Sequence, residues 1–449
     1  MNRVCCSWMS RDFLTDLAAH GPEGSRAILV GVELKGSKSA WTLQDSLDEL
    51  ARLAETAGLA VAGATYQKLD HPNPRTWIGS GKVRELGELL AASDATYVLF
   101  DDELSPGQQR KLEAALGDGI RIIDRTRLIL DIFSQHAQSR EGKLQVELAQ
   151  YQYLLPRLAG MRMGLSQQVG GTGAGPVGLR GPGETQLELD RRQARRRIAT
   201  LRAGLEEVKV QRSQHRARRE NSGLPVAALV GYTNAGKSSL LNALTGAGVL
   251  VQDKLFATLD PTTRRLSLPQ GREVLLTDTV GFIRKIPHDL VAAFRATLEG
   301  IEEASVILHV VDSSHPHPAE QIAAVDEVLG GLDLSSIPRL IVWNKIDLLP
   351  GAEAPAVLGG RHELSLAVSA RTGAGLPEML AKIETILGEG LEEVQVTIPY
   401  GRYDLVQLVY EQGSVTTKAD GPAGVSLGAR VPAALARILD EFVVKPGAN

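Results

Sequence analysis

The sequence predicts an α/β protein with several domains, in which strands of parallel sheets alternate with helices along the chain. Short apolar segments alternate with segments in which apolar residues recur every three or four positions, as expected for strands and helices in turn. The chain has 449 residues, which is too many for one ordinary hydrophobic core. Near its middle, a Gly-rich segment follows a predicted strand and precedes a predicted helix, which is the context of a phosphate-binding loop.

The composition is that of an ordinary globular protein, with 43% hydrophobic and 23% charged residues. A net charge of -4 gives no overall preference for nucleic acid. Cys5 and Cys6 are adjacent and can build neither a disulfide framework nor a zinc site by themselves. No apolar run reaches the roughly 18 residues of a membrane helix, and residues 1–25 do not resemble a signal peptide. We expect a cytoplasmic protein, with peripheral attachment to a membrane as the alternative.

We expect five parts along the chain. They are a flexible extension (1–25), an N-terminal parallel α/β domain (26–130), a helical hairpin (131–222) with a Gly-rich tip loop (164–183), a P-loop domain (224–389) and a small C-terminal α/β domain (390–449). The P-loop domain should have a mostly parallel sheet with helices on both faces. Strands are predicted at 26–34, 61–69, 96–100, 120–124, 226–230, 272–278, 305–311, 339–343, 364–368 and 394–398. Helices are predicted at 43–57, 81–92, 106–116, 404–412 and 432–442.

Apolar residues at alternating spacings of three and four predict the two helices of the hairpin. The first helix carries Leu144, Leu148, Tyr151, Leu155 and Leu158, and the second carries Ala194, Ile198, Leu201, Leu205 and Val208. The simplest packing is antiparallel, with the Gly-rich loop at the tip.

The second helix of the hairpin is strongly basic, although the whole protein is acidic. A charge run is often only a solvated helix face, but a basic helix beside a long Gly-rich loop favours contact with nucleic-acid phosphates. Few aromatic residues lie near the tip, so structured RNA is a better match than single-stranded bases. The predicted RNA-binding residues are Arg180, Arg191, Arg192, Arg195, Arg196 and Arg197.

The segment Gly231–Ser238 matches the phosphate-binding P-loop pattern Gly-x-x-x-x-Gly-Lys-Ser. Glycines let backbone N–H groups converge on phosphate oxygens, and the N-terminus of the next helix adds partial positive charge. Lys237 can reach the β- and γ-phosphates, and Ser238 can bind Mg²⁺. The predicted nucleotide contacts here are Gly231, Tyr232, Thr233, Asn234, Ala235, Gly236, Lys237, Ser238 and Ser239.

The segment Asp278-Thr279-Val280-Gly281 follows the next predicted strand. Asp278 can hold Mg²⁺ through water, and the N–H of Gly281 can bond the γ-phosphate, which makes this loop a sensor of triphosphate. Many GTPases have a glutamine directly after such a motif to orient the attacking water. Phe282 stands there instead, so we expect slow hydrolysis by the protein alone and completion of the site by a partner.

The segment Asn344-Lys345-Ile346-Asp347 follows another predicted strand and indicates recognition of guanine. The Asp347 carboxylate can accept hydrogen bonds from the N1–H and the 2-amino group of guanine, a donor pair that adenine lacks. Lys345 can lie along the base, and Asn344 can join this loop to the P-loop. The segment Ser369-Ala370-Arg371 ends the next strand and can offer a backbone N–H to the guanine O6.

A further threonine should close over the γ-phosphate and bind Mg²⁺. Its candidates lie in the segment Phe256–Arg264, where spacing alone does not choose between Thr258, Thr262 and Thr263. The predicted contacts of this segment are Phe256, Ala257, Thr258, Leu259 and Asp260.

A second P-loop is suggested by Gly79–Val83 but fails in detail. Thr76 stands where the first glycine is needed, and Val83 replaces the residue that binds Mg²⁺. A structural turn that enters a helix is the favoured interpretation of this segment.

Three segments resemble the HflX family of ribosome-associated GTPases: Gly79–Val83, Gly181–Asp190 and Phe256–Arg264. The resemblance covers roughly residues 26–389. It implies Thr258 as the Mg²⁺ threonine, with Thr262 as the alternative. It also implies a protein that splits or rescues stalled or idle ribosomes under stress. We expect Lys237, Thr258 and Gly281 to be the catalytic groups and the protein to be monomeric when free.

The partner that the resemblance implies is the large ribosomal subunit with its RNA, which the hairpin tip would approach. Two other functions remain open at this point. One is a signalling GTPase with a protein partner, and the other is an ATP-driven remodeller of RNA that uses residues 26–130.

Overall fold

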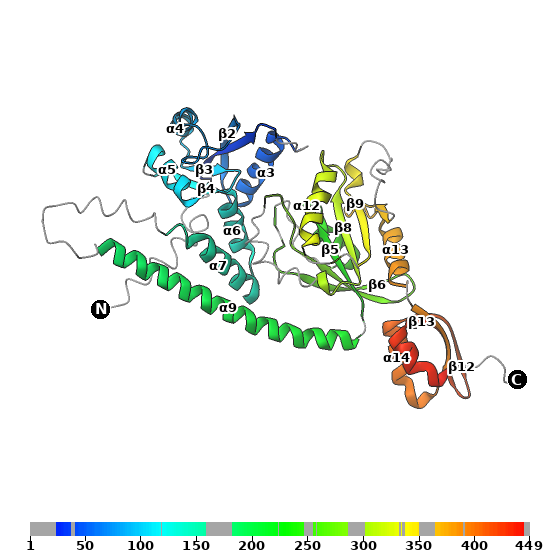
Figure 1. The fold of residues 1–449 in the computed structure, drawn as a ribbon. Coiled ribbons are helices and arrows are strands. Elements are labelled where there is room, and N and C mark those ends of the chain that lie inside the picture. Colours follow the sequence, from blue (N-terminus) through cyan, green and yellow to red (C-terminus); the bar gives the residue numbers. More distant parts are fainter. Residues whose placement is uncertain are drawn as a thin grey trace. The chain divides into compact units, whose positions relative to one another are not determined.

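The computed structural model describes residues 24–36, 41–117, 119–158, 182–222, 224–246, 255–256, 258–285, 301–331, 334, 337–349, 364–388 and 391–443. Most of the predicted N-terminal extension and of the Gly-rich tip loop, with Arg180 and Ala257, lies outside these residues. The chain divides into two compact units, drawn in Figure 1. Unit 1 comprises Met1–Lys209, Lys254–Leu259 and Arg284–Arg295, and unit 2 comprises Val210–Asp253, Asp260–Ile283 and Ala296–Asn449.

The first sheet is parallel throughout, as the alternation of strands and helices predicts. Its elements are β1 (Arg26–Leu34), α3 (Leu43–Thr56), β2 (Ala60–Leu69), α4 (Ser80–Ser93), β3 (Tyr97–Phe100), α5 (Pro106–Leu116) and β4 (Arg121–Asp124), with strand order β2-β1-β3-β4. Leu86 and Leu112 of α4 and α5 join Val30 and Val98 in one buried cluster. Helix α3 packs on β1, where Gly31 leaves room for the Leu47 side chain.

A buried ionic cluster lies where β3 ends. The Arg125 guanidinium, 1% exposed, pairs with Glu49 and, at 2.8 Å, with Asp101. The Ser46 hydroxyl donates to the other oxygen of Asp101 at 2.7 Å. Because a buried carboxylate needs both charge compensation and hydrogen bonds, these partners fix the Asp101 side chain in place.

The helical hairpin is present and antiparallel. It is formed by α7 (Arg140–Leu154) and α9 (Pro182–Ser222), which follow α6 (Arg125–His136). The predicted apolar residues Leu148, Tyr151, Ala194, Ile198 and Leu201 make one buried cluster between the two helices. Figure 1 shows α9 as one long helix beside α7.

The sheet of unit 2 has six strands in the order β10-β9-β8-β5-β7-β6, and only β6 is antiparallel to its neighbour. Its elements are β5 (Val226–Gly231), α10 (Lys237–Thr245), β6 (Thr262–Ser267), β7 (Glu273–Asp278), β8 (Val306–Asp312), α12 (Pro318–Gly330), β9 (Arg339–Asn344), η1 (Ile346–Leu348), β10 (Ser365–Ala367) and α13 (Leu376–Gly388). Leu340 packs with α10 and α13 on one face, and Ile341 packs with α12 on the other. The predicted parallel sheet with helices on both faces is therefore confirmed, while β6 was not predicted.

The C-terminal part was only partly predicted. It contains β11 (Leu391–Ile398), η3 (Tyr400–Arg402), α14 (Tyr403–Gln412), β12 (Ser414–Gly421), β13 (Gly424–Pro432), α15 (Ala433–Leu439) and η4 (Asp440–Phe442). The sheet is antiparallel, with order β11-β13-β12, and the hairpin of β12 and β13 was missed. Its outer strand, β12, is polar and lacks the apolar run that predicts a strand.

Candidate nucleotide site

The P-loop connects β5 to α10 with two glycines that no other residue could replace without strain. Gly236 has φ of 92°, and a Cβ atom there would lie 2.2 Å from Nδ2 of Asn344. A Cβ atom on Gly231 would lie 2.2 Å from the carbonyl oxygen of Val310 in the neighbouring strand β8. The close approach of these backbones gives the loop its shape, with Tyr232, Thr233, Asn234 and Ala235 between the glycines.

Lys237 begins α10 and is only 6% exposed. Its ammonium group donates to the carbonyl oxygens of Gly231 at 3.1 Å and Tyr232 at 2.9 Å. Burial lowers the pKa of Lys237 to about 8, and the nearby Asp278 carboxylate partly opposes this change. The lysine is therefore held at the centre of the loop, where a phosphate group would complete its charge compensation.

Ser238 and Asp278 are brought together, as a shared magnesium site requires. The Ser238 hydroxyl donates to Oδ2 of Asp278 at 2.6 Å. Hydroxyl and carboxylate oxygens are the ligands that Mg²⁺ prefers, and the ion usually keeps several waters as well. The two side chains fit the predicted role, with Ser239 next to them in α10.

The Asp278–Gly281 loop lies directly against the P-loop. The Thr233 N–H donates to the Phe282 carbonyl at 2.7 Å, and the Phe282 N–H donates to the Gly231 carbonyl at 3.1 Å. A Cβ atom on Gly281 would lie 2.9 Å from Cα of Thr233, so only glycine fits there. The Thr279 hydroxyl donates to the Leu229 carbonyl at 2.7 Å, which holds the start of this loop on β5, and Val280 beside it is buried.

The Asn344 side chain joins the predicted base-recognition loop to the P-loop. Its Nδ2 donates to the Ala235 carbonyl at 2.9 Å, and its Oδ1 accepts from the Ala370 N–H at 3.1 Å. Lys345 has a positive φ of 65° and pairs with Asp312 at 2.6 Å. Asp312 ends β8 and belongs to none of the predicted motifs.

Asp347 is oriented by two neighbours. Its Oδ1 accepts from the Ser369 hydroxyl at 2.7 Å, and its Oδ2 pairs with Arg371 at 2.7 Å. Ser369 is completely buried, whereas the Arg371 side chain is 72% exposed. A guanine base could therefore displace the arginine while Ser369 keeps the carboxylate in position. The Ser369 hydroxyl is a positioning group that the sequence pattern alone did not reveal.

The three candidate Mg²⁺ threonines belong to different parts of the structure. Thr262 and Thr263 belong to β6, and the Thr263 hydroxyl is 3.0 Å from that of Thr277 in β7. Thr258 lies in the segment 254–259, which groups with unit 1 together with Phe256 and Leu259. Asp260, which follows, groups with unit 2.

The segment around Lys82 has a structural role in the described part of the chain. Helix α4 begins after Gly79, and the Gly79 N–H donates to the Gln67 side chain at 2.8 Å. The Lys82 ammonium group pairs with Glu85 at 2.8 Å and donates to the Thr65 hydroxyl at 3.3 Å. These contacts engage the Lys82 ammonium group within its own domain. They agree with the interpretation of this segment as a structural turn that enters a helix.

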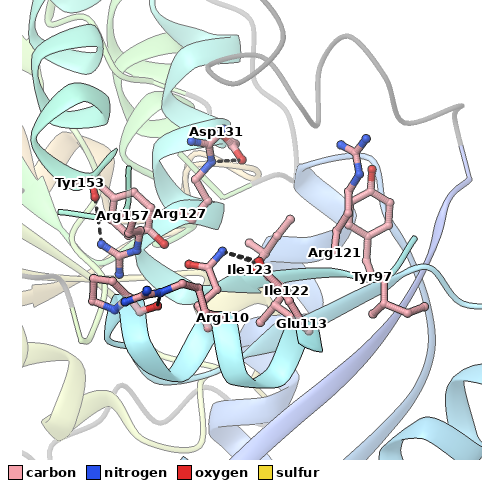
Figure 2. A pocket seen from close by; sticks show the side chains of 13 residues that line it. Tyr97, Arg110, Glu113, Arg121, Ile122, Ile123, Arg127, Asp131, Tyr153 and Arg157 are labelled. Atoms are coloured by element: carbon pink, nitrogen blue, oxygen red, sulfur yellow. Dashed lines mark hydrogen bonds and ion pairs between the residues drawn. The ribbon is translucent and has the colours of Figure 1, made fainter. Parts of the chain in front are cut away.

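Unit 1 contains a cavity of about 320 Å³ (Figure 2). It is lined by residues of α5, β4 and α6, together with Tyr153 and Arg157. Its walls include Arg110, Arg121, Arg127 and Arg157. Arg127 pairs with Asp131 at 3.0 Å, and Arg157 pairs with Asp124 at 3.2 Å while its guanidinium lies 3.5 Å from the centre of the Tyr153 ring. Carboxylates compensate much of this positive charge, so we assign no anionic ligand to the cavity.

The predicted RNA-binding arginines lie on α9 and differ in their surroundings. Arg192, Arg195 and Arg196 are exposed on the side away from the buried cluster of the hairpin. Arg197 instead holds Glu147 of α7 with two hydrogen bonds, of 2.6 and 2.8 Å. Arg197 therefore stabilises the hairpin, and Arg191 is half-buried.

The pKa of Lys237 predicts a pH dependence of nucleotide binding. The phosphates attract the protonated lysine, so binding should weaken as the pH rises through about 8. Between pH 7 and pH 9 we expect the affinity for GDP to fall roughly tenfold, as the protonated fraction falls from about nine-tenths to about one-tenth. Isothermal titration calorimetry measures this change. The Lys237→Ala protein should bind weakly at both values, and equal affinities of the unaltered protein would contradict the prediction.

Asp347 predicts a change in base preference. Asp347→Asn replaces a carboxylate acceptor by an amide that can donate to the 2-oxo group of xanthine. We expect the ratio of GTP to xanthosine triphosphate affinities to fall at least tenfold, as measured by competition with a fluorescent nucleotide. Arg371→Ala serves as the control, because it removes the other partner of Asp347 without changing the carboxylate. An unchanged ratio in Asp347→Asn would mean that the base binds elsewhere.

Four family models match successive parts of the chain. Their descriptions are GTP-binding GTPase N-terminal (residues 44–134), GTP-binding GTPase Middle Region (136–219), 50S ribosome-binding GTPase (226–345) and HflX C-terminal domain (358–443). Among solved structures, the crystal structure of the SsGBP and GDP complex is similar at 25% identity and a TM-score of 0.44, over 81% of this chain and 98% of that one.

Two curated relatives match almost the whole chain. The GTPase HflX of Caldanaerobacter subterraneus subsp. tengcongensis is 45% identical over 419 residues, which are 93% of this chain and 94% of the relative. The GTPase HflX of Escherichia coli K12 is 41% identical over 411 residues, which are 91% and 94% of the two chains. With a P-loop, a loop suited to guanine and a match of this extent, the chain belongs to the HflX family of GTPases.

Proposed function

We propose that this GTPase binds the RNA of the large ribosomal subunit while it carries GTP, and that hydrolysis releases it. The observation that carries the proposal is the exposed basic face of α9. Between Arg191 and Leu205 the helix contains six arginines and no acidic residue: Arg191, Arg192, Arg195, Arg196, Arg197 and Arg202. A surface of this charge density attracts nucleic-acid phosphates and releases their counterions on binding.

The hairpin supports the proposal because it presents these charges on a rigid helix. The buried cluster of Leu148, Ile198 and Leu201 holds α9 against α7. The Glu147–Arg197 pair adds an ionic contact between the helices. Arg192, Arg195 and Arg196 then face solvent without the need to order a loop, which lowers the entropy cost of binding. The description of the matched family model, 50S ribosome-binding GTPase, names the large subunit as the partner class.

At the nucleotide site, we propose a role for each of the predicted residues. Lys237 and the N–H groups of the P-loop bind the phosphates, and Asp347 binds guanine. Ser238, Thr258 and Asp278 (through water) would hold Mg²⁺, which supplies compensation for the charge that develops on the transferred phosphoryl group. The N–H of Gly281 would contact the γ-phosphate and report its presence.

Phe282 explains why the partner is needed. Its side chain is 3% exposed and has no group that can hold a water molecule for attack on phosphorus. We therefore expect the ribosomal partner to complete the site or to order the protein's own groups around the water. Splitting or rescue of stalled or idle ribosomes under stress is the cellular role that we propose for this cycle.

We propose a cytoplasmic protein that is monomeric when free. In the part of the chain that the structure describes, no helix is long and apolar enough to cross a membrane.

Turnover of GTP tests the proposed partner. We expect purified large subunits to raise the rate at least tenfold, because completion of such sites by a partner contributes roughly 10³–10⁵-fold in other GTPases. Phosphate release from the unaltered protein, with and without subunits, measures this. The Lys237→Ala protein should show no turnover either with or without subunits. This control excludes a contaminating GTPase in the subunit preparation. Identical rates with and without subunits would sink the proposal of activation by the ribosome.

Alanine replacements of Arg192, Arg195 and Arg196 test the RNA-binding face. We expect weaker binding to large subunits. The slope of the logarithm of the binding constant against the logarithm of the salt concentration should become less steep by up to about three units. Sedimentation of the subunits at several salt concentrations measures both, with a non-hydrolysable GTP analogue present. The matched control replaces the exposed Arg52, Arg75 and Arg84 of the N-terminal domain. Binding that is equally reduced in the control would show only an effect of net charge.

A further inference from the structure

The turn that follows β8 lies against the base-recognition loop. Asp312 ends β8 and is in register with Asn344, which ends the neighbouring parallel strand β9. The N–H and the hydroxyl of Ser313 both donate to the carbonyl oxygen of Asn344, at 3.0 and 2.6 Å. That carbonyl belongs to the peptide group that leads into Lys345, so the turn fixes the backbone at the start of the loop.

Lys345 has an unusual backbone conformation. Its φ of 65° lies in the left-handed region, which is unfavourable for a residue with a side chain and persists only where the surrounding structure fixes it. The two hydrogen bonds from Ser313 supply part of that constraint. Because such conformations cluster at binding sites, the backbone of Lys345 indicates that the placement of its side chain matters for function.

The Asp312 carboxylate holds the end of the Lys345 side chain. Its Oδ2 accepts from the Lys345 ammonium group at 2.6 Å. Its Oδ1 accepts from the N–H and the hydroxyl of Ser314, at 3.0 and 2.6 Å. The side chains of Asp312 and Lys345 are only 14% and 24% exposed, so solvent screens this ion pair less than an exposed one. Because Ser314 orients the carboxylate, the acceptor is in place independently of the lysine.

The aliphatic stem of Lys345 lies between these two fixed ends. It passes beside the P-loop, since a Cβ atom on Gly236 would lie 3.9 Å from Cε of Lys345. Gly236 directly precedes α10, whose N-terminus belongs to the proposed phosphate site. Asp347, proposed to bind the edge of guanine, follows Lys345 by two residues. The stem thus lies next to the proposed phosphate site and close to the residue proposed for the base.

A fixed lysine stem can contribute to the binding of a purine ring. A lysine side chain has many rotamers in solution, and ordering it on binding costs conformational entropy. The contact with Asp312 orders the side chain before any nucleotide arrives, so binding does not incur this cost. The methylene groups of the stem are apolar and suit the flat face of a purine. Such a contact depends on the area of the ring and not on the groups at its edge.

We propose that Asp312 is a positioning residue for nucleotide binding, which anchors the Lys345 stem as a preformed wall for the purine ring. The proposal rests on the assignment of guanine to Asp347 made above. The two carboxylates have different tasks. Asp347 selects the base through its polar edge, whereas Asp312 acts through Lys345 on the face of the ring and adds the same affinity for every purine nucleotide.

Calorimetric affinities of the full-length Asp312→Ala protein test the proposal, with Mg²⁺ present. The ligands are GDP and inosine diphosphate, which keeps the purine ring and the 6-oxo group but lacks the 2-amino group. We expect both affinities to fall by the same factor, roughly three- to tenfold, for the loss of one partly buried ionic contact. The ratio of the two affinities should stay within about twofold, whereas Asp347→Asn should change it. A binding stoichiometry equal to that of the unaltered protein shows that the variant is folded.

A double-mutant cycle separates this role from a general effect on the turn. Lys345→Met keeps an apolar stem but removes the ammonium group, and by itself should weaken the binding of both diphosphates equally. Asp312 then has nothing left to anchor, so adding Asp312→Ala should weaken GDP binding by less than about twofold. The matched control is Asp326→Ala, which breaks the Asp326–Arg339 pair at the opposite end of β9 and should leave both affinities unchanged.

Unchanged affinities in Asp312→Ala and Lys345→Met overturn the proposal, and so does an Asp312→Ala effect of full size in the Lys345→Met background. A changed ratio of the two affinities in Asp312→Ala also overturns it, because Asp312 would then act on the edge of the base. A different result marks failure of the underlying assignment. If Asp347→Asn alters neither the affinity for GDP nor the ratio, guanine does not bind at Asp347.

Discussion

The two hydrogen bonds between Phe282 and the P-loop are the contacts on which the rest of the nucleotide site depends. They place Gly281 beside Lys237 and Thr233. In the proposed site, the N–H of Gly281 would contact the γ-phosphate. Such a contact would let this loop respond to the presence of the third phosphate.

The remaining polar groups of the site are fixed before any nucleotide arrives. Asn344 joins the base loop to the P-loop, and Ser369 orients Asp347 from a buried position. Such preorganisation lowers the entropy cost of nucleotide binding. The loop after β7 is then the part of the site that we expect to respond to the third phosphate. The helical hairpin carries the basic face proposed for RNA.

The features that could be predicted from the sequence are those that depend on residues close together along the chain. Periodicity identified the parallel sheets and the apolar residues of the hairpin, and the P-loop and its accompanying motifs were recognised from spacing. Strands β6 and β12 were missed because they are polar sequences at sheet edges, where pairing rather than local pattern decides the structure. The contact of Lys285 with Asp101 joins residues 184 positions apart, and Asp312 reaches Lys345 from another strand. No local pattern reveals such pairs, since the fold alone brings them together.

The central claim is that the third phosphate controls association with the large ribosomal subunit. Sedimentation of the full-length protein with purified large subunits tests it, with a non-hydrolysable GTP analogue, with GDP or without nucleotide. The expected result is strong co-sedimentation with the analogue and at least tenfold weaker binding in the other two conditions. Equal binding in all three conditions would contradict the claim, because the third phosphate would then have no consequence for the RNA-binding hairpin.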